Sequence, residues 1–148
     1  MSAALGAVQV DRLDEILARR ERVAAAYTRR LLRLEHVETP TVTSWVTRMS
    51  WFVYVVRLAP WLDRDGVIRA LGARGVPSRP YFPPIHLQPL YRERFGFRAG
   101  DFPVSEDMGR RCLALPFFGG MSDLQIETVC GALAEIVAEA ESARRASA

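Results

Sequence analysis

The sequence contains no lysine, because all 20 of the residues counted as lysine or arginine are arginines. A lysine amine is the side-chain group that forms a Schiff base with a carbonyl cofactor or substrate. An arginine guanidinium stays protonated and is a poor nucleophile, so it does not replace that amine. Chemistry through a lysine imine is therefore excluded for this chain by itself.

Cysteine and histidine are scarce, with two residues of each. Cys112 and Cys130 lie in apolar stretches, which is typical of buried, reduced thiols in a cytosolic protein. A disulfide or a reactive thiol stays open as the alternative. His36 and His86 lack any metal-ligand spacing with these cysteines, so we expect no metal site. The reduced thiols make us expect a cytoplasmic location.

Several other signatures are missing. No apolar run approaches the roughly 20 residues that span a bilayer, and the first residues lack the basic start of a signal peptide. The sequence has no GxGxxG, phosphate-binding P-loop or GxSxG motif. The formal charge is +3, but acids are interleaved with the arginines, so no basic stripe forms. We expect neither membrane nor nucleic-acid binding.

What is present fits one globular domain of mixed helices and strands, with 148 residues, 49% of them hydrophobic. Apolar residues at three- and four-residue steps predict an amphipathic helix over residues 2–34, ended by Thr39-Pro40. The remaining elements follow from local patterns. They are a strand over 51–58, a helix over 64–74 capped by Asp63, a strand over 76–79 in a β-α-β arrangement, a proline-rich loop over 80–89, a short helix or turn over 91–97, a helix opening at 101–103, a strand over 113–115, and a last helix with a frayed tail over 141–148.

Two helix starts carry more specific signals. Glu106 and Asp107 lie near the start of the helix that opens at Pro103, where negative charge is favourable. Ser122 and Gln125 form the S-x-x-Q pattern of a capping box, and the helix that follows is expected to turn Leu124, Val129, Leu133, Ile136 and Val137 inward.

The segment RPYFPPIHLQPLY, residues 79–91, is the strongest candidate for a binding site. Stiff loops that present polar side chains are frequent sites of binding, and the prolines stiffen this one. Arg79 can bind phosphate or carboxylate, Tyr81 offers a hydroxyl and a stacking face, and His86 can donate or accept a proton. The alternative is a structural loop whose polar side chains satisfy only their own backbone.

Longer stretches resemble the C-terminal part of the DegT/DnrJ/EryC1/StrS aminotransferases, a fold-type I pyridoxal-phosphate family that acts on nucleotide-linked keto sugars. The stretches occur in the family's order and cover nearly the whole chain. They are AALGAVQVDRLDEILARR, SWFVYVVRL, RDGVIRALGARGVPSRPYFPPIHLQPLY, GDFPVSEDMGRRCLALPFF and the closing helix.

The resemblance implies an α/β (α+β) fold, the C-terminal small domain of the fold-type I aminotransferases. Residues 1–34 would form a linker helix from a large domain, and residues 35–148 a small domain with a short, mainly antiparallel sheet packed by helices. His86 matches a histidine that lies near the sugar substrate in relatives, and by position Tyr81 and Arg79 would lie close to it. The Schiff-base lysine and phosphate cup belong to the large domain.

The resemblance therefore predicts the substrate-side domain of a pyridoxal-phosphate-dependent nucleotide-sugar aminotransferase, with no catalytic residue of its own and no covalently bound cofactor. Its expected partners are a nucleotide-linked keto sugar and a large-domain polypeptide, an intact paralogue or a second copy of this chain. The alternative is a non-catalytic binding or oligomerisation module derived from that family.

Overall fold

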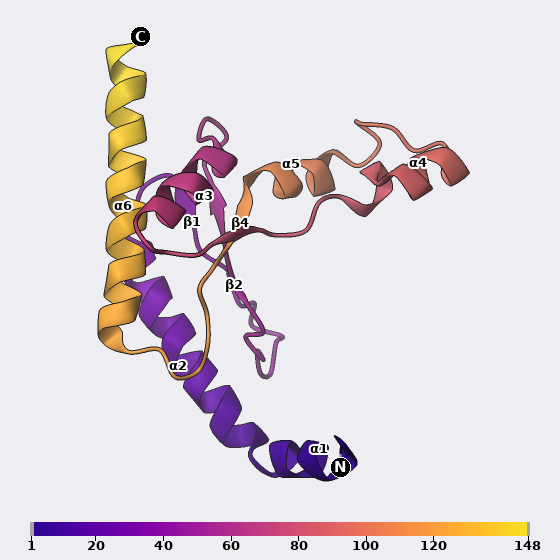
Figure 1. Cartoon of the computed structure of the whole chain (residues 1–148), viewed down its shortest axis with the longest axis vertical. Coiled ribbons are helices and arrows are strands. Elements are labelled where there is room, and N and C mark those ends of the chain that lie inside the picture. Colours follow the sequence, from indigo (N-terminus) through magenta and orange to yellow (C-terminus); the bar gives the residue numbers. More distant parts are fainter. Residues whose placement is uncertain (1, 148) are drawn as a thin grey trace.

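The computed structural model describes residues 2–147 and shows a small four-stranded sheet with helices around it (Figure 1). The helices are α1 (Ser2–Asp11), α2 (Leu13–Leu31), α3 (Arg64–Ala73), α4 (Pro89–Phe95), α5 (Pro103–Arg111) and α6 (Asp123–Ala146), with a short 3-10 helix, η1 (Ile85–Leu87). The strands are β1 (Val37–Glu38), β2 (Tyr54–Leu58), β3 (Arg79–Pro80) and β4 (Cys112–Leu115).

The sheet has the strand order β1-β2-β4-β3, and every neighbouring pair is antiparallel. Strand β2 pairs with β4 so that Tyr54 faces Leu115 and Arg57 faces Cys112. Because β2 and β3 both run antiparallel to β4, they are parallel to each other. The second strand, predicted over 76–79, lies at Arg79–Pro80 instead, but the β-α-β order is confirmed, with β4 inserted between its two strands.

The core lies where α2, α3 and α6 pack on one face of this sheet. Alternate residues of β2, namely Tyr54, Val56 and Leu58, are fully buried, as the two-residue period of a strand requires. Helices α2 and α6 lie side by side along the long axis of the molecule (Figure 1). The opposite face of β2 lies beside α5, where Arg57 contacts Met108. Arg57 also forms an ion pair with Glu38 of the neighbouring strand β1.

An aromatic stack forms the centre of the core. The rings of Tyr27 and Tyr54 lie 5.0 Å apart, and both side chains are completely buried. The Tyr27 hydroxyl donates to the Pro116 carbonyl oxygen at 2.7 Å, and the Tyr54 and Thr28 hydroxyls are 2.8 Å apart. Burial raises the pKa of Tyr54 to about 12, although the Thr28 hydrogen bond acts in the opposite direction. Both phenols are thus neutral and bonded inside the core.

Local capping signals are confirmed. The Asp63 carboxylate accepts the backbone N–H of Asp65 at 3.1 Å and starts α3. At the start of α6, the Ser122 hydroxyl accepts the Gln125 N–H, and the Gln125 side chain accepts the Ser122 N–H. Such contacts depend only on residues two or three positions apart, which is why the sequence predicts them.

The predicted helix over residues 2–34 is wrong as one element, because it divides at Arg12 into α1 and α2. Aspartate is a weak helix former, and Asp11 and Asp14 flank the division. Asp14 and Glu15 then lie in the first turn of α2, where negative charge is stabilising. Figure 1 shows α1 turned away from the line of α2.

The predicted strand over residues 51–58 begins later, at Tyr54. Trp51 has a φ of 48°, a left-handed conformation that a strand does not accommodate. Its ring is nevertheless buried and stacks on Tyr54 at 5.9 Å. The strand starts only after this bend in the backbone.

The last helix also differs from expectation, because α6 continues to Ala146 instead of fraying from residue 141. The Arg144 guanidinium lies 4.9 Å from the centre of the Trp61 ring, and His36 Nε2 lies 3.9 Å from a Glu141 carboxylate oxygen. These contacts attach the final turns to the body. Leu124, expected inside, is 72% exposed, whereas the other four predicted inward residues are buried.

Candidate functional site

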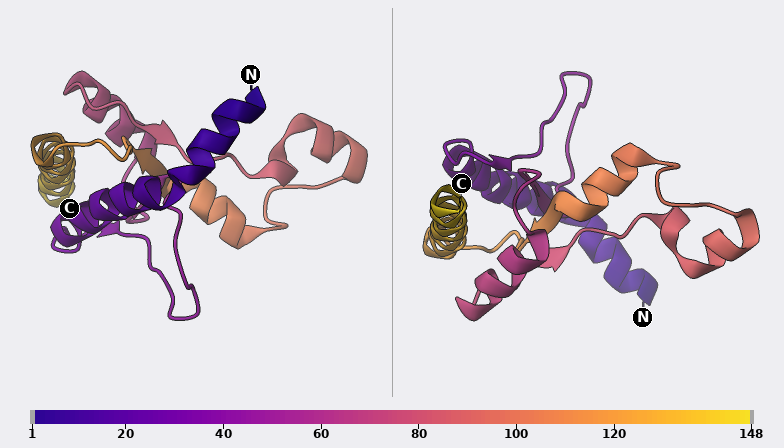
Figure 2. Two further views of the ribbon diagram at one scale, coloured as in Figure 1. Left: turned by 90° about the horizontal axis from the view of Figure 1, so that it is seen from below. Right: turned by 90° about the horizontal axis from the view of Figure 1, so that it is seen from above.

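The chain leaves the body after β3 and forms an arm, residues 81–102, that carries η1 and α4 and returns through α5 (Figure 2). Both views of Figure 2 show the arm projecting to the side opposite α6. Most of the arm's side chains are exposed, but His86 is buried. The arm therefore positions one buried imidazole outside the main core.

His86 is held by Glu106, the fourth residue of α5. The His86 Nε2 atom lies 3.0 Å from Glu106 Oε1, and the two side chains are only 8% and 10% exposed. The same carboxylate oxygen accepts the backbone N–H of Gly100 at 2.8 Å and that of Phe102 at 3.4 Å. Glu106 thus connects η1 with the turn that precedes α5.

These hydrogen bonds set the charge of the site. The Gly100 N–H, and after it the His86 hydrogen bond, hold the pKa of Glu106 below its ordinary value of 4.5, although burial acts in the opposite direction. Glu106 is therefore an ionised acceptor at neutral pH. A buried carboxylate with this many donors is a stable anchor for the imidazole.

A cavity of about 310 Å³ lies beside the imidazole. Its wall is mainly aromatic, and the His86 ring lies 4.7 Å from the Phe102 ring and 6.4 Å from the Phe97 ring. The other lining residues are Ile85, Tyr91 and Ser105. An apolar wall with a few polar atoms is typical of a small-molecule site.

The three residues predicted for substrate binding lie on different segments, Arg79 in β3, His86 in η1 and Tyr81 between them. Arg79 lies on β3 opposite Ala114, and its side chain is exposed. The Tyr81 ring packs against Phe82 at 4.9 Å, also at the surface. Within residues 2–147 no hydrogen bond or ring contact joins either of them to His86.

Glu106 is the site residue that sequence reasoning missed. Its position near the start of α5 predicted only a favourable interaction with the helix dipole. The contact with His86 joins residues 20 positions apart, and no local spacing indicates it.

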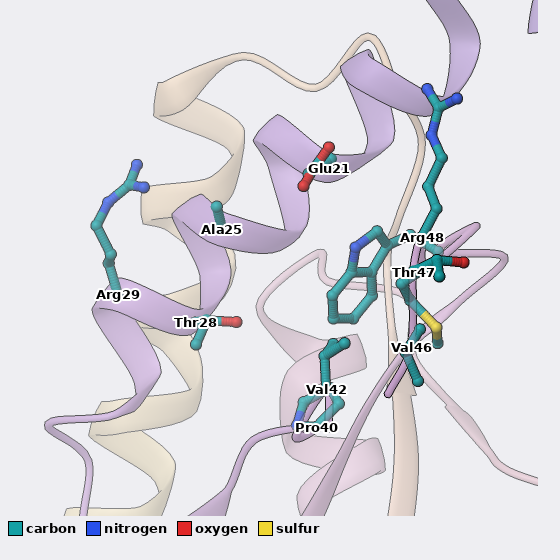
Figure 3. Close-up of a pocket in the computed structure, with 11 residues that line it drawn as sticks. Glu21, Ala25, Thr28, Arg29, Pro40, Val42, Val46, Thr47 and Arg48 are labelled. Atoms are coloured by element: carbon teal, nitrogen blue, oxygen red, sulfur yellow. The ribbon is translucent and has the colours of Figure 1, made fainter. Parts of the chain in front are cut away.

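A second cavity, of about 730 Å³, is a groove between α2 and the loop over residues 39–51. Figure 3 shows Glu21, Ala25, Thr28 and Arg29 along α2, with Val42 and Arg48 on the loop at the other side of the groove. An ion pair between Arg48 and Asp14 at 2.6 Å attaches the loop to the start of α2. The groove is lined by both methyl groups and charged groups. This mixture is more typical of a surface that contacts another part of a protein than of a catalytic centre.

The residues described offer no covalent attachment point for pyridoxal phosphate. The chain has no lysine amine for pyridoxal phosphate. Among residues 2–147 no three His, Cys, Asp or Glu side chains gather in a way that would hold a metal ion. None of the helices within residues 2–147 has the length and hydropathy of a membrane span.

The two cysteines are unreactive thiols. Desolvation raises the pKa of the Cys112 thiol, and it raises that of Cys130 to about 11, so both remain protonated at neutral pH.

The architecture is that of the small α/β domain of aminotransferases. Over residues 1–134 the sequence matches the DegT/DnrJ/EryC1/StrS aminotransferase family, and the chain belongs to that family. It is 36% identical over 139 residues to GDP-perosamine synthase from Caulobacter vibrioides, and the matched stretch covers 93% of this chain and 37% of that protein. It is 35% identical over 129 residues to a dTDP-4-dehydro-2,3,6-trideoxy-D-glucose 4-aminotransferase from Saccharopolyspora spinosa, over 87% of this chain and 32% of that one.

A solved structure shows the same fold. The aminotransferase TlmJ from Streptoalloteichus hindustanus superposes with a TM-score of 0.81 at 30% identity, over 93% of this chain and 36% of that one. The chain thus spans about a third of the length of the relatives it matches. The predicted family and fold class are confirmed.

Proposed function

We propose that this chain forms the substrate-side domain of a pyridoxal-phosphate-dependent nucleotide-sugar aminotransferase, which transfers an amino group to a keto sugar. The observation that carries the proposal is that the chain matches about a third of the length of two sugar aminotransferases. The absence of lysine from the chain agrees with it. The Schiff-base amine and the cofactor site would then come from a large domain. By itself, the chain would not turn over.

In this proposal His86 contacts the sugar, and Arg79 and Tyr81 contribute from the adjoining segment. His86 lines an aromatic-walled cavity, which supports its role. Arg79 and Tyr81 are exposed at the base of the arm, where a second domain or a ligand can reach them. A guanidinium at that place suits the phosphates of a nucleotide.

Residues 1–34 would connect this domain to the large domain, with residues 35–148 forming the small domain. Helix α1 supports this role, because its apolar side chains are uncovered: Leu5 is 65% exposed and Val10 is 68% exposed. Apolar surface of this kind indicates contact with another part of a protein. The partner would be a large-domain polypeptide or an intact paralogue.

Reconstitution tests the proposal. The purified chain mixed with pyridoxal phosphate should show no visible imine absorbance and no amino transfer. Fused to the large domain of a family member, it should aminate a nucleotide-linked keto sugar. In that fusion His86→Ala should lower kcat/KM at least about tenfold, since a hydrogen-bonding group at the substrate is lost. Leu124→Ala, at an exposed position on α6, is the matched control and should change little.

Two results would contradict it. Turnover by the chain alone would show that the missing amine is not required. Folded fusions that bind the cofactor yet fail with every nucleotide-linked keto sugar would show that this domain does not provide the substrate side.

A second candidate function, an oligomerisation module, is favoured by the exposed aromatic residues on the loop before β2. Trp45 is 81% exposed and Phe52 is 76% exposed. Under this hypothesis, light scattering should give a multiple of the 16.6 kDa chain mass, and Trp45→Ser with Phe52→Ser should return it to one chain. Leu124→Ser is the control at another exposed position. A monomer at all concentrations would eliminate this candidate as a self-associating module.

A further inference from the structure

The hydrogen bonds around Glu106 determine which nitrogen of His86 carries a proton. Glu106 Oε1 faces three nitrogen atoms, those of Gly100, Phe102 and the His86 imidazole. The two backbone groups can only donate. An ionised carboxylate can only accept, so the third partner, His86 Nε2, must also bring a hydrogen to the oxygen.

We propose that Glu106 is a positioning residue that holds His86 with its Nε2 protonated, so that the imidazole in its neutral form presents Nδ1 as a hydrogen-bond acceptor. A neutral imidazole has one N–H and one lone pair, and fixing the first at Nε2 fixes the second at Nδ1. The ligand group that His86 recognises is then a donor, such as a sugar hydroxyl or an amino group. That last step rests on the proposed function, whereas the tautomer does not.

Packing keeps the ring in this orientation. Both side chains of the pair are nearly excluded from water, so an unpaired Glu106 carboxylate would be costly. The Phe102 ring lies against the imidazole, and the Phe97 ring meets it edge-on, with 89° between the planes.

The same contacts connect the tautomer to the shape of the arm. Glu106 belongs to α5, Gly100 and Phe102 belong to the turn before it, and His86 belongs to η1. One carboxylate thus fixes the place of the imidazole and its protonation pattern together. A glutamine at this position can keep its oxygen opposite all three groups and so preserves the acceptor, whereas an alanine removes the acceptor and frees the imidazole to change tautomer.

Nitrogen-15 NMR of the whole purified chain tests the tautomer directly. The chain has only two histidines, so His36→Gln identifies the His86 signals. At a pH where the same spectra show a neutral ring, the wild type should have a protonated Nε2 and an unprotonated Nδ1. In Glu106→Ala, which removes the acceptor, the populations should shift toward Nδ1–H, whereas Glu106→Gln should keep the proton on Nε2. A wild-type ring with its proton on Nδ1 would overturn the proposal, and this measurement needs no variant at position 106 to fold.

Activity of the fusion with a large domain tests the ligand step separately. The side chain of asparagine places a polar atom near the position of Nδ1, and glutamine places one near Nε2. We expect His86→Asn to retain more kcat/KM than His86→Gln, and Glu106→Ala to lose about tenfold. The reverse order would overturn the acceptor role. If no fusion transfers an amino group, the proposed function fails, and the NMR result still decides the tautomer.

Discussion

Replacing Tyr54 by alanine is expected to lower the free energy of unfolding by about 3–5 kcal/mol. The ring is fully buried and stacks on Tyr27, Trp51 and Phe117, at centroid distances of 5.0, 5.9 and 6.2 Å respectively. Removing it opens a hole that these aromatic neighbours cannot fill. Urea unfolding followed by circular dichroism measures the change. Since single domains are stable by only about 5–15 kcal/mol, this loss removes a large fraction of the total stability.

Tyr54→Phe separates packing from hydrogen bonding. It keeps the ring and loses only the 2.8 Å contact with the Thr28 hydroxyl, so the expected loss is about 1 kcal/mol. Tyr91→Ala, a half-buried tyrosine in the arm, controls for the loss of a tyrosine away from the core. Equal destabilisation by Tyr54→Phe and Tyr54→Ala would contradict the packing explanation.

Replacing Gly109 by alanine is expected to destabilise the protein by about 1–3 kcal/mol, even though alanine is the better helix former. A Cβ atom at this position in α5 would lie 2.7 Å from Pro84 Cδ and 2.8 Å from Pro84 Cγ. The proline ring is rigid and directly precedes η1, which carries His86. Relief of the clash must therefore move η1 or α5, and the His86 signals in the NMR spectrum should shift with it.

Gly131→Ala is the matched control for that substitution. Gly131 lies in the middle of α6, it is exposed, and no atom lies within 4 Å of its hypothetical Cβ. Alanine should stabilise the helix there by up to about 1 kcal/mol. If Gly109→Ala were stabilising to the same degree, the close approach of α5 to Pro84 would be disproved.

The elements that the sequence predicted well depend on neighbouring residues. Asp63 caps α3, and the Ser122 and Gln125 pair caps α6, through contacts within three positions along the chain. Strand β4 also follows from local pattern, since Leu113 to Leu115 form an apolar run closed by Pro116. The resemblance to a family likewise indicated the fold class correctly, because it uses the order of motifs over nearly the whole chain.

The structure departs from these predictions where distant residues meet. Helix α6 stays intact to Ala146 because Trp61 and His36 contact its final turns from across the molecule. The tail, read alone, has only the features of a frayed end. Trp51 likewise adopts a left-handed backbone conformation while its ring packs on Tyr54, so β2 starts three residues later than its apolar pattern suggests.

The sequence by itself determined that this chain supplies no Schiff-base amine, since lysine is absent and arginine is no substitute. It also determined His86 as a candidate, because the proline-rich segment around it is distinctive. Only the tertiary structure decided what holds that histidine. The carboxylate of Glu106, 20 residues further along the chain, reaches the imidazole because η1 and α5 pack together, and packing across such a separation has no local signature.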